Sequence, residues 1–329
     1  MQTIAVIGGG AWGTAMATVA ARAGRDVLLW VREQEVVDAI NNAHENTPFL
    51  PGISLDPKIR ATSDYEDLVA LDAYLLVTPA QHLRQVTSDL ADVLRKGALV
   101  AICAKGIEQN SGMLMSDVMS ETLPQALPAI LSGPSFASDV ARGLPTAVTL
   151  ACRDEERAQS LADAIGSPSF RPYWSPDVIG AQIGGAIKNV LAIACGIVDG
   201  KGLGESARAA LTARGFAEMT RFGVSLGAGR ETLTGLSGLG DLILTCTSTQ
   251  SRNMSLGHAL GTGETLETVL GNRTSVAEGV YTATAVRKLS EERHLDMPIC
   301  ESIADIVSGA KSVDEAITSL LARPFTTEV

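Results

Sequence analysis

The sequence is poor in aromatic residues, in paired cysteines and in positive charge, and each shortage excludes a class of function. Phe, Trp and Tyr make up 4% of the 329 residues, too few for the stacking platforms that bind single-stranded nucleic acids. Acidic residues outnumber basic ones by 37 to 26, and the formal net charge of −11 argues against binding of a nucleic-acid backbone. Small anionic ligands stay open, because a site for them needs only a few well-placed cations.

The motifs of hydrolases and metalloenzymes are also missing. The five cysteines are widely spaced and form no C-x-x-C pair, so we expect neither a disulfide framework nor a zinc site, and we expect a reducing compartment. None of the four histidines has the H-E-x-x-H spacing of a metal site, and no G-x-S-x-G nucleophile elbow occurs. The sequence therefore predicts no bound metal.

Two apolar stretches, residues 2–21 and 178–198, have the length of a membrane span. Consecutive glycines interrupt the first stretch, and no basic segment precedes it. The second stretch contains several glycines and carries Lys188 in its middle, which favours a buried helix of a folded domain. We therefore expect no membrane insertion and a cytoplasmic location.

The first half of the chain alternates short apolar runs with helical patterns, which is typical of a mostly parallel, doubly wound α/β sheet. The apolar runs are continuous, so strands buried on both faces are predicted at residues 3–8, 26–30, 73–78, 98–104, 128–132, 146–151 and 169–174. Helices are predicted between them, including residues 14–23, 34–43 and 81–96.

After about residue 176 the strand pattern stops and long helical patterns rich in Ala, Gly and Leu follow. Helices are expected at residues 177–199, 205–226, 276–292 and 298–310. The change predicts two domains, an α/β domain over residues 1–178 and an all-helical domain over residues 179–329.

A glycine-rich turn follows the first predicted strand and precedes a helix. Gly8, Gly10 and Gly13 form the pattern G-x-G-x-x-G. In a Rossmann-type domain these glycines permit the tight turn, the approach of a pyrophosphate and the packing of helix on strand. The pyrophosphate then lies on the free N–H groups at the helix N-terminus. This context favours dinucleotide binding over a turn that binds nothing.

Arg32 follows the second predicted strand, where a site for NAD usually has a carboxylate. A guanidinium suits the 2′-phosphate of NADP, so we expect NADP(H) to be favoured. The neighbouring Glu33 could hold a ribose, which leaves NAD(H) open, and Arg32 could also be a solvated side chain without a ligand.

Two lysines stand in apolar surroundings. Lys105 ends a predicted strand, and ligands of open α/β sheets bind at the carboxyl ends of strands; the alternative is a structural lysine that reaches solvent. Lys188 is the single charge between Asp177 and Asp199, and burial would lower its pKa into the range of a general acid or base. Asp241 could orient Lys188, cap a helix, or form with it a purely structural ion pair.

Two further segments offer groups that suit an anion. Ser251, Arg252 and Asn253 combine a hydroxyl, a guanidinium and an amide, which match phosphate geometry, although the same residues suit a capped helix start. Gly133 and Ser135 lie in a segment that follows a strand and opens a helix, where backbone N–H groups can meet a ligand.

Together these segments resemble the bacterial NAD(P)-dependent glycerol-3-phosphate dehydrogenases. The resemblance runs in order over nearly the whole chain and rests on residues 8–13, 46–53, 104–106, 132–137, 184–190, 238–247, 251–253 and 276–279. The segments around Lys188 and Asp241 are much more specific than the glycine turn.

The resemblance implies reversible interconversion of dihydroxyacetone phosphate and sn-glycerol 3-phosphate, which supplies phospholipid synthesis. It implies a helical substrate domain, Lys188 as general acid/base with Asp241 beside it, and Lys105 between cofactor and substrate. The substrate-binding residues that it implies are Lys105, Gly133, Ser135, Lys188, Asn189, Asp241, Thr245, Ser251, Arg252 and Asn253. The cofactor-binding residues that it implies are Gly8, Gly10, Ala11, Trp12, Gly13, Arg32, Lys105, Ala137, Arg252, Val276 and Glu278.

Two other functions are weighed against this one. A two-domain NADP-dependent reductase of a β-hydroxy acid or a ketopantoate-like substrate would need a carboxylate-binding pattern in place of Ser251, Arg252 and Asn253. A non-catalytic NAD(P)-sensing protein would leave the isolated Lys188 without a task. The sequence leaves the oligomeric state open, with a homodimer as one expectation.

Overall fold

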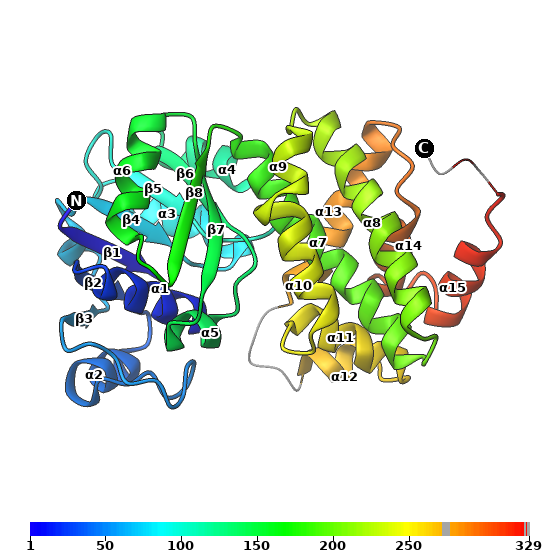
Figure 1. The fold of residues 1–329 in the computed structure, drawn as a ribbon, viewed down its shortest axis with the longest axis horizontal. Helices are drawn as coiled ribbons and strands as arrows, with labels where there is room; N and C mark the ends of the chain where they lie inside the picture. The colour runs from blue at the N-terminus through cyan, green and yellow to red at the C-terminus, as the bar shows by residue number, and fades with distance from the viewer. Residues whose placement is uncertain (272–276, 326, 328–329) are drawn as a thin grey trace.

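The computed structural model describes residues 1–271, 277–325 and 327, and it places a helix-covered sheet beside a bundle of helices (Figure 1). The strands are β1 (Thr3–Ile7), β2 (Asp26–Trp30), β3 (Ile59–Thr62), β4 (Ala73–Leu76), β5 (Leu99–Ile102), β6 (Leu127–Ser132), β7 (Thr146–Cys152) and β8 (Phe170–Ser175). The helices that accompany the sheet are α1 (Ala11–Arg22), α2 (Gln34–Ala43), η1 (Glu66–Leu68), η2 (Ala80–His82), α3 (Leu83–Asp89), α4 (Met115–Thr122), α5 (Ala137–Arg142) and α6 (Glu155–Ile165). The helices after the sheet are α7 (Val178–Gly200), α8 (Glu205–Ser225), α9 (Arg230–Thr234), η3 (Leu236–Gly240), α10 (Asp241–Thr247), α11 (Arg252–Gly261), α12 (Leu266–Gly271), α13 (Glu278–Glu292), α14 (Pro298–Val307) and α15 (Val313–Leu321).

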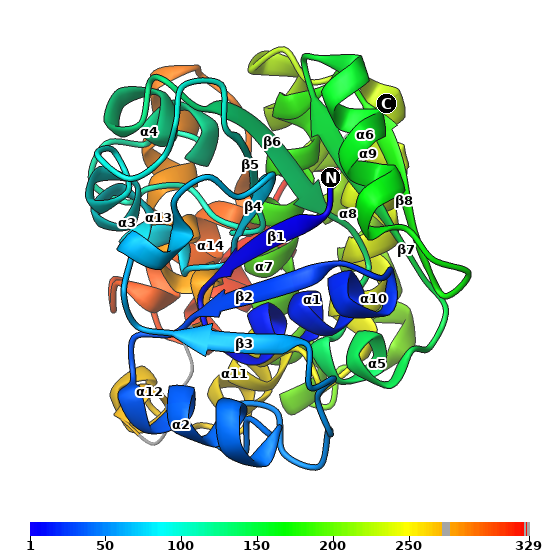
Figure 2. The ribbon, with the colours of Figure 1, turned by 90° about the vertical axis from the view of Figure 1, so that its left-hand side faces the viewer.

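The eight strands form one sheet in the order β3-β2-β1-β4-β5-β6-β7-β8 (Figure 2). Every neighbouring pair is parallel except β6 and β7. The strand order reverses direction between β1 and β4, and in sheets of this kind ligands bind outside the carboxyl ends of the strands at that point. The fold therefore directs the loops after β1, β4, β5 and β6 to one edge.

The central strands of the sheet are buried on both faces, as their continuous apolar runs predict. Ile4 and Val6 of β1 belong to a core that includes Met16 of α1. Ala5 and Ile7 point to the opposite face, where the core includes residues of α3 and α4. Because neighbouring strand residues point to opposite faces, a run of four buried residues requires helices on both sides. At the edge strand β8 the prediction of burial on both faces is wrong, because Tyr173 and Trp174 are exposed, with no further strand beyond β8 among the described residues.

Seven of the eight strands lie where the sequence predicts them, and β3 is missed. Its segment is short and lies at the sheet edge, where Arg60 is exposed, so it has no continuous apolar run. The helix predicted over residues 81–96 is too long, because α3 ends at Asp89. Leu90 and Leu94 are buried and keep a helical spacing, but the chain there forms turns, so the apolar pattern extends beyond the helix.

Helix α7 is the centre of the helical part. It is the one helix among the described residues that is long and apolar enough to cross a membrane, and 94% of its most apolar window is buried in the protein. It is therefore a core helix. Glycines bring its neighbours close: a Cβ on Gly196 would lie 2.1 Å from the carbonyl oxygen of Met254 in α11. Close backbone contact of this kind is available only to glycine.

Candidate active site

Lys188 lies buried in the middle of α7 and has two polar partners. Its Nζ is 2.5 Å from Oδ1 of Asp241 and 2.9 Å from Oγ1 of Thr245. Both partners are on α10, one turn apart, and the Thr245 hydroxyl also donates to the Asp241 carbonyl. The three side chains named from the sequence are thus brought together by the packing of α10 on α7.

The absence of a side chain at Gly184 allows this close packing. A Cβ on Gly184 would lie 2.3 Å from the carbonyl oxygen of Ser237, so only glycine lets η3 approach α7 at this distance. Asp241 follows η3 directly and begins α10, where Gly240, and not Asp241, is the N-cap residue. The interpretation of Asp241 as a helix cap is therefore wrong, and its carboxylate is directed at the lysines instead.

Lys105 meets the same carboxylate from the sheet. It follows β5, and its Nζ lies 2.7 Å from Oδ2 of Asp241 and 2.9 Å from the carbonyl oxygen of Gly133 after β6. Asp241 is 1% exposed and holds one ammonium on each oxygen. A carboxylate between two cations in a buried place joins the sheet edge to the helical part.

The protonation of Lys188 is tuned by these surroundings. Burial lowers the pKa of Lys188 from its ordinary value of 10.5 to about 8. The carboxylate of Asp241 raises this pKa, and the positive charge of Lys105 lowers it. The ammonium and the neutral amine are therefore both accessible near neutral pH, which is the requirement for a group that gives and takes a proton.

A chain of amides connects the loop of Lys105 to the helices. Asn189 on α7 donates to the Lys105 carbonyl at 2.9 Å, and Asn253 on α11 donates to Oδ1 of Asn189 at 3.0 Å. Oδ1 of Asn253 accepts from the N–H of Gly279 on α13. Each of these amides makes hydrogen bonds inside the protein, so they hold three helices in register around the lysines.

The segment from Ser251 to Asn253 begins α11. Ser251 is the N-cap of this helix, and its hydroxyl accepts from the N–H of Met254, as in an ordinary capped helix. Arg252 is exposed, and its charge acts on the carboxylate of Glu278. Although the residue as a whole is exposed, burial lowers the pKa of Arg252, so its guanidinium lies in a partly desolvated place beside the buried Asn253.

The loop after β6 brings Gly133 and Ser135 to the same edge of the sheet. Gly133 has φ +149°, and a Cβ there would lie 2.9 Å from Cα of Val148. Its carbonyl accepts from Lys105 and also from the Ser135 hydroxyl at 3.0 Å. Ala137 begins α5 after this loop.

The glycine turn fits a dinucleotide pyrophosphate. A Cβ on Gly13 would lie 1.7 Å from the Gly8 carbonyl oxygen, so α1 can start this close to β1 only with glycine there. A Cβ on Gly10 would meet nothing within 4 Å, so the helix N-terminus opens on free space. Ala11 and Trp12 form the first turn of α1, and Nε1 of Trp12 is buried without a partner among the described atoms. These features match the cradle that a pyrophosphate occupies.

Asn46 supports this turn and was not singled out as a site residue by the sequence. It is fully buried, and its Nδ2 donates to the Gly9 carbonyl at 2.8 Å and to Oγ1 of Thr14 at 2.7 Å. In the sequence, Asn46 could be noticed only as a member of the segment 46–53. Nothing near it along the chain shows that its side chain reaches the turn after β1.

The end of β2 lies beside the glycine turn, since Gly8 N–H donates to the Trp30 carbonyl. Arg32 follows, with 81% of its side chain exposed, and its guanidinium pairs with Oε1 of Glu33 at 2.6 Å. The two charges that the sequence relates to the choice of nucleotide therefore stand next to each other at this edge.

Glu278 connects α13 to η2, which follows β4. Its Oε1 accepts from the Ala80 N–H at 2.9 Å, and its Oε2 is buried without a hydrogen-bond partner among the described residues. Burial raises the pKa of Glu278, while the Ala80 N–H and the charge of Arg252 lower it. Val276, which the sequence also assigns to the cofactor, lies outside the described residues.

Comparisons with known proteins agree over the whole chain. The family model of the NAD-dependent glycerol-3-phosphate dehydrogenase N-terminus matches residues 3–158, and that of the C-terminus matches residues 177–318. A protein named glycerol-3-phosphate dehydrogenase (NAD(P)+) from Parvibaculum lavamentivorans is 61% identical over 99% of this chain and 98% of its own length. A crystal structure of a glycerol-3-phosphate dehydrogenase from Coxiella burnetii is 36% identical, with a TM-score of 0.94 over 98% of this chain and 99% of that one. A ketopantoate reductase from Ralstonia eutropha is 16% identical, with a TM-score of 0.62 over 96% of this chain and 100% of that one, and shares the fold alone.

Proposed function

The chain belongs to the NAD-dependent glycerol-3-phosphate dehydrogenase family, and on this premise we propose that it interconverts dihydroxyacetone phosphate and sn-glycerol 3-phosphate with NAD(P)H. It is an oxidoreductase of the NAD(P)-dependent class. The observation that carries the proposal is the contact of Lys188 and Lys105 with one buried carboxylate at the ligand-binding edge of the sheet.

The residues that hold the cofactor are the glycine turn, Trp12, Arg32 and Glu278, together with Ala137 and Val276 as expected from the family resemblance. When bound, NAD(P)H supplies the hydride that adds to the carbonyl carbon of dihydroxyacetone phosphate. The protein contributes a helix N-terminus for the pyrophosphate, and the open space before Gly10 supports this placement.

Lys188 is the general acid of the reduction. Negative charge grows on the carbonyl oxygen as the ketone is reduced, and the ammonium of Lys188 donates a proton to that oxygen. With a pKa of about 8, Lys188 is mainly protonated at neutral pH. In the oxidation direction the neutral amine takes the proton of the alcohol.

Asp241 and Lys105 prepare the site for this transfer. Asp241 holds the Nζ of Lys188 in place together with Thr245, so the amine is oriented before the substrate binds. Lys105 keeps a second positive charge beside the first, and in a buried place this potential stabilises the developing oxyanion.

The phosphate of the substrate is bound by Arg252, with Asn253 and the loop of Gly133 and Ser135 around it. A guanidinium can hold a phosphate through two parallel hydrogen bonds, which fixes the distant carbonyl over the site. The Ser251 hydroxyl caps α11, so we assign Ser251 the task of placing Arg252 at the start of that helix.

NADP(H) is favoured over NAD(H) in this proposal. Arg32 is exposed and can turn from Glu33 toward a 2′-phosphate, a stronger acceptor site than one carboxylate oxygen. Glu33 can accept from a ribose hydroxyl, so NAD(H) is also a substrate. The enzyme acts in the cytoplasm, where its product supplies phospholipid synthesis, and a homodimer is its expected assembly.

The proposal is tested by following NADPH absorbance with the purified protein. We expect oxidation of NADPH with dihydroxyacetone phosphate and none with a panel of 2-keto acids that includes ketopantoate. Turnover of ketopantoate without turnover of dihydroxyacetone phosphate would instead support the alternative reductase. Repeating the assay with NADH gives the cofactor preference.

A further inference from the structure

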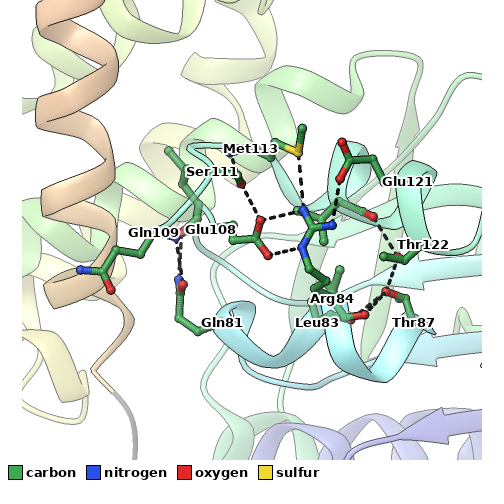
Figure 3. Close-up of polar contacts among 12 residues, drawn as sticks. Gln81, Leu83, Arg84, Thr87, Glu108, Gln109, Ser111, Met113, Glu121 and Thr122 are labelled. Carbon is green, nitrogen blue, oxygen red and sulfur yellow. Dashed lines mark hydrogen bonds and ion pairs between the residues drawn. The ribbon is translucent and has the colours of Figure 1, made fainter. Parts of the chain in front are cut away.

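The chain that follows Lys105 is held by side chains from η2 and α3, which lie between β4 and β5 (Figure 3). Ile107 forms an isolated bridge with Leu114, and Glu108 N–H donates to the Met113 carbonyl. We call residues 106–113 the lysine-bearing loop, because Lys105 lies directly before it. This loop has no strand or helix of its own, so its position depends on these contacts.

Gln81 in η2 fixes the backbone of the loop on both sides of Glu108. Its Nε2 donates to the Ile107 carbonyl at 2.9 Å, and its Oε1 accepts from the Gln109 N–H at 2.9 Å. One amide therefore satisfies a donor and an acceptor two residues apart, which sets the backbone direction there.

Arg84 on α3 holds the side chain of Glu108. Its Nε and Nη2 donate to the two oxygens of Glu108 at 2.9 and 2.8 Å, a two-point contact that sets both position and angle. Glu108 is 8% exposed, and Arg84 lowers its pKa, so the carboxylate stays charged at neutral pH. Arg84 also donates from Nη1 to Glu121 on α4 (Figure 3).

Gly106 lies between Lys105 and Ile107, the first of the loop residues that Gln81 contacts. A Cβ there would lie 2.7 Å from Cβ of Ala80 and 3.2 Å from Oε2 of Glu278, so the position is packed although the residue is flexible. Lys105 must reach Asp241 and the Gly133 carbonyl at once. A displaced loop would move the Lys105 backbone away from the position from which its ammonium reaches both groups.

We propose that Gln81, Arg84 and Glu108 are positioning residues that place the Lys105 ammonium in the active site, an inference that rests on the proposed function. None of the three is assigned to substrate or cofactor. Their contribution is preorganisation: the lysine is held before the substrate arrives, and no rearrangement is needed during the reaction.

The test compares Glu108→Gln with Glu121→Gln. The two substitutions make the same chemical change on two partners of one arginine, and only Glu108 belongs to the lysine-bearing loop. We expect kcat/KM for dihydroxyacetone phosphate to fall about tenfold in Glu108→Gln and to change little in Glu121→Gln. The isosteric Gln81→Glu loses the donor to Ile107 and should behave like Glu108→Gln.

A double-mutant cycle separates positioning from general destabilisation. In a Lys105→Met background, Glu108→Gln and Gln81→Glu should have almost no further effect, because the group through which they act is gone. The same tenfold loss in that background, or an equal loss in Glu121→Gln, would overturn the proposal.

Hydrogen–deuterium exchange gives a readout without turnover. In the free protein, amides 106–113 should exchange faster in Glu108→Gln and Gln81→Glu than in the wild type or in Glu121→Gln. Unchanged exchange of these amides would contradict the proposal that Gln81, Arg84 and Glu108 hold the lysine-bearing loop. If the wild type fails to reduce dihydroxyacetone phosphate, the proposed function fails. The exchange result still decides, in that case, whether these three residues hold the loop.

Discussion

The ammonium of Lys188 and the carboxylate of Asp241 are 2.5 Å apart in the interior of the protein, although 53 residues separate them along the chain. Neither group would be stable there alone, because burying a single charge costs several kcal/mol. The pair is retained together with a third charge, Lys105, on the other carboxylate oxygen. A cluster with two cations and one anion has a net positive charge, which would stabilise the negative charge that the proposed reaction develops on the substrate.

Replacing Lys188 tests the proton-transfer role. Lys188→Met should lower kcat by about 10²–10⁴-fold, the usual contribution of a general acid, while NADPH still binds. Binding is measured by quenching of the intrinsic fluorescence, and turnover by NADPH absorbance. Near-normal kcat in this variant would exclude Lys188 as the proton donor.

The pH dependence of the two directions should be opposite. Reduction needs the protonated Lys188, so its kcat/KM should fall as pH rises through about 8, and oxidation needs the neutral amine, so its kcat/KM should rise over the same range. The measurement is kcat/KM in both directions between pH 6 and pH 10, a range of about two units on each side of that pKa, because kcat/KM reports the pKa of the free enzyme. Parallel profiles would show that another group transfers the proton.

Asn46 should matter for the cofactor and not for the substrate. Asn46→Leu removes the donor to the Gly9 carbonyl and to Thr14, which loosens the glycine turn, so KM for NADPH should rise about tenfold. KM for dihydroxyacetone phosphate at saturating NADPH should stay close to the wild-type value. The matched control is Asn42→Leu, because Asn42 is exposed at the end of α2. A larger effect on the substrate than on NADPH would contradict this role.

Arg32 should discriminate between the two nucleotides. Arg32→Ala should raise KM for NADPH about tenfold or more, because a charge-assisted contact to the 2′-phosphate is lost, with little effect on NADH. Glu33→Gln releases Arg32 from its ion pair and should lower KM for NADPH. Equal changes with both nucleotides in Arg32→Ala would place the arginine outside the nucleotide site.

Glu218 should make the stability of the helical part depend on pH. Its carboxyl accepts from the N–H groups of Ile299 and Cys300 at the start of α14, and burial raises its pKa from 4.5 to about 7. A raised pKa contributes stability that is complete below pH 4.5 and is lost as pH rises through about 7.

Urea unfolding at pH 5 and pH 8 checks this sign. From pH 5 to pH 8, the free energy of unfolding of the wild type should fall by up to about 3 kcal/mol more than that of Glu218→Gln. The reason is that each pKa unit corresponds to about 1.4 kcal/mol. The comparison concerns the change with pH, so a lower absolute stability of the glutamine variant does not affect it. Glu292→Gln, an exposed glutamate, is the control and should follow the wild type. A variant with the same pH dependence as the wild type would contradict the raised pKa.

Much of this architecture could be predicted because local pattern and tertiary role coincide. The central strands of the sheet are continuous apolar runs, and the glycine turn has the G-x-G-x-x-G spacing between a strand and a helix that is typical of a dinucleotide-binding turn. Lys188 was conspicuous because it is the only charge in the apolar stretch of residues 178–198. The missed strand β3 lies at the edge of the sheet, where the exposed Arg60 interrupts the apolar pattern. Helix α3 is shorter than predicted because the apolar spacing continues through Leu90 and Leu94 after the helix has ended.

The contacts that finish the site could not be predicted in this way. Asn46 contacts Gly9 across a separation of 37 residues, and Arg84 contacts Glu108 across 24. These separations are longer than the local patterns from which helices, strands and turns are predicted. Each is an ordinary polar residue near a helix end, and such residues are usually solvated.

By itself, the sequence determined the α/β and helical organisation, the glycine turn and the isolation of one lysine, because these depend on residue type and spacing along the chain. Only the tertiary structure decided that Asp241 would join Lys188 to Lys105 and that Gln81 and Arg84 would hold the lysine-bearing loop. The physical reason is that hydrogen bonds and ion pairs act over about 3 Å, and which distant groups come that close is set by the packing of helices and strands.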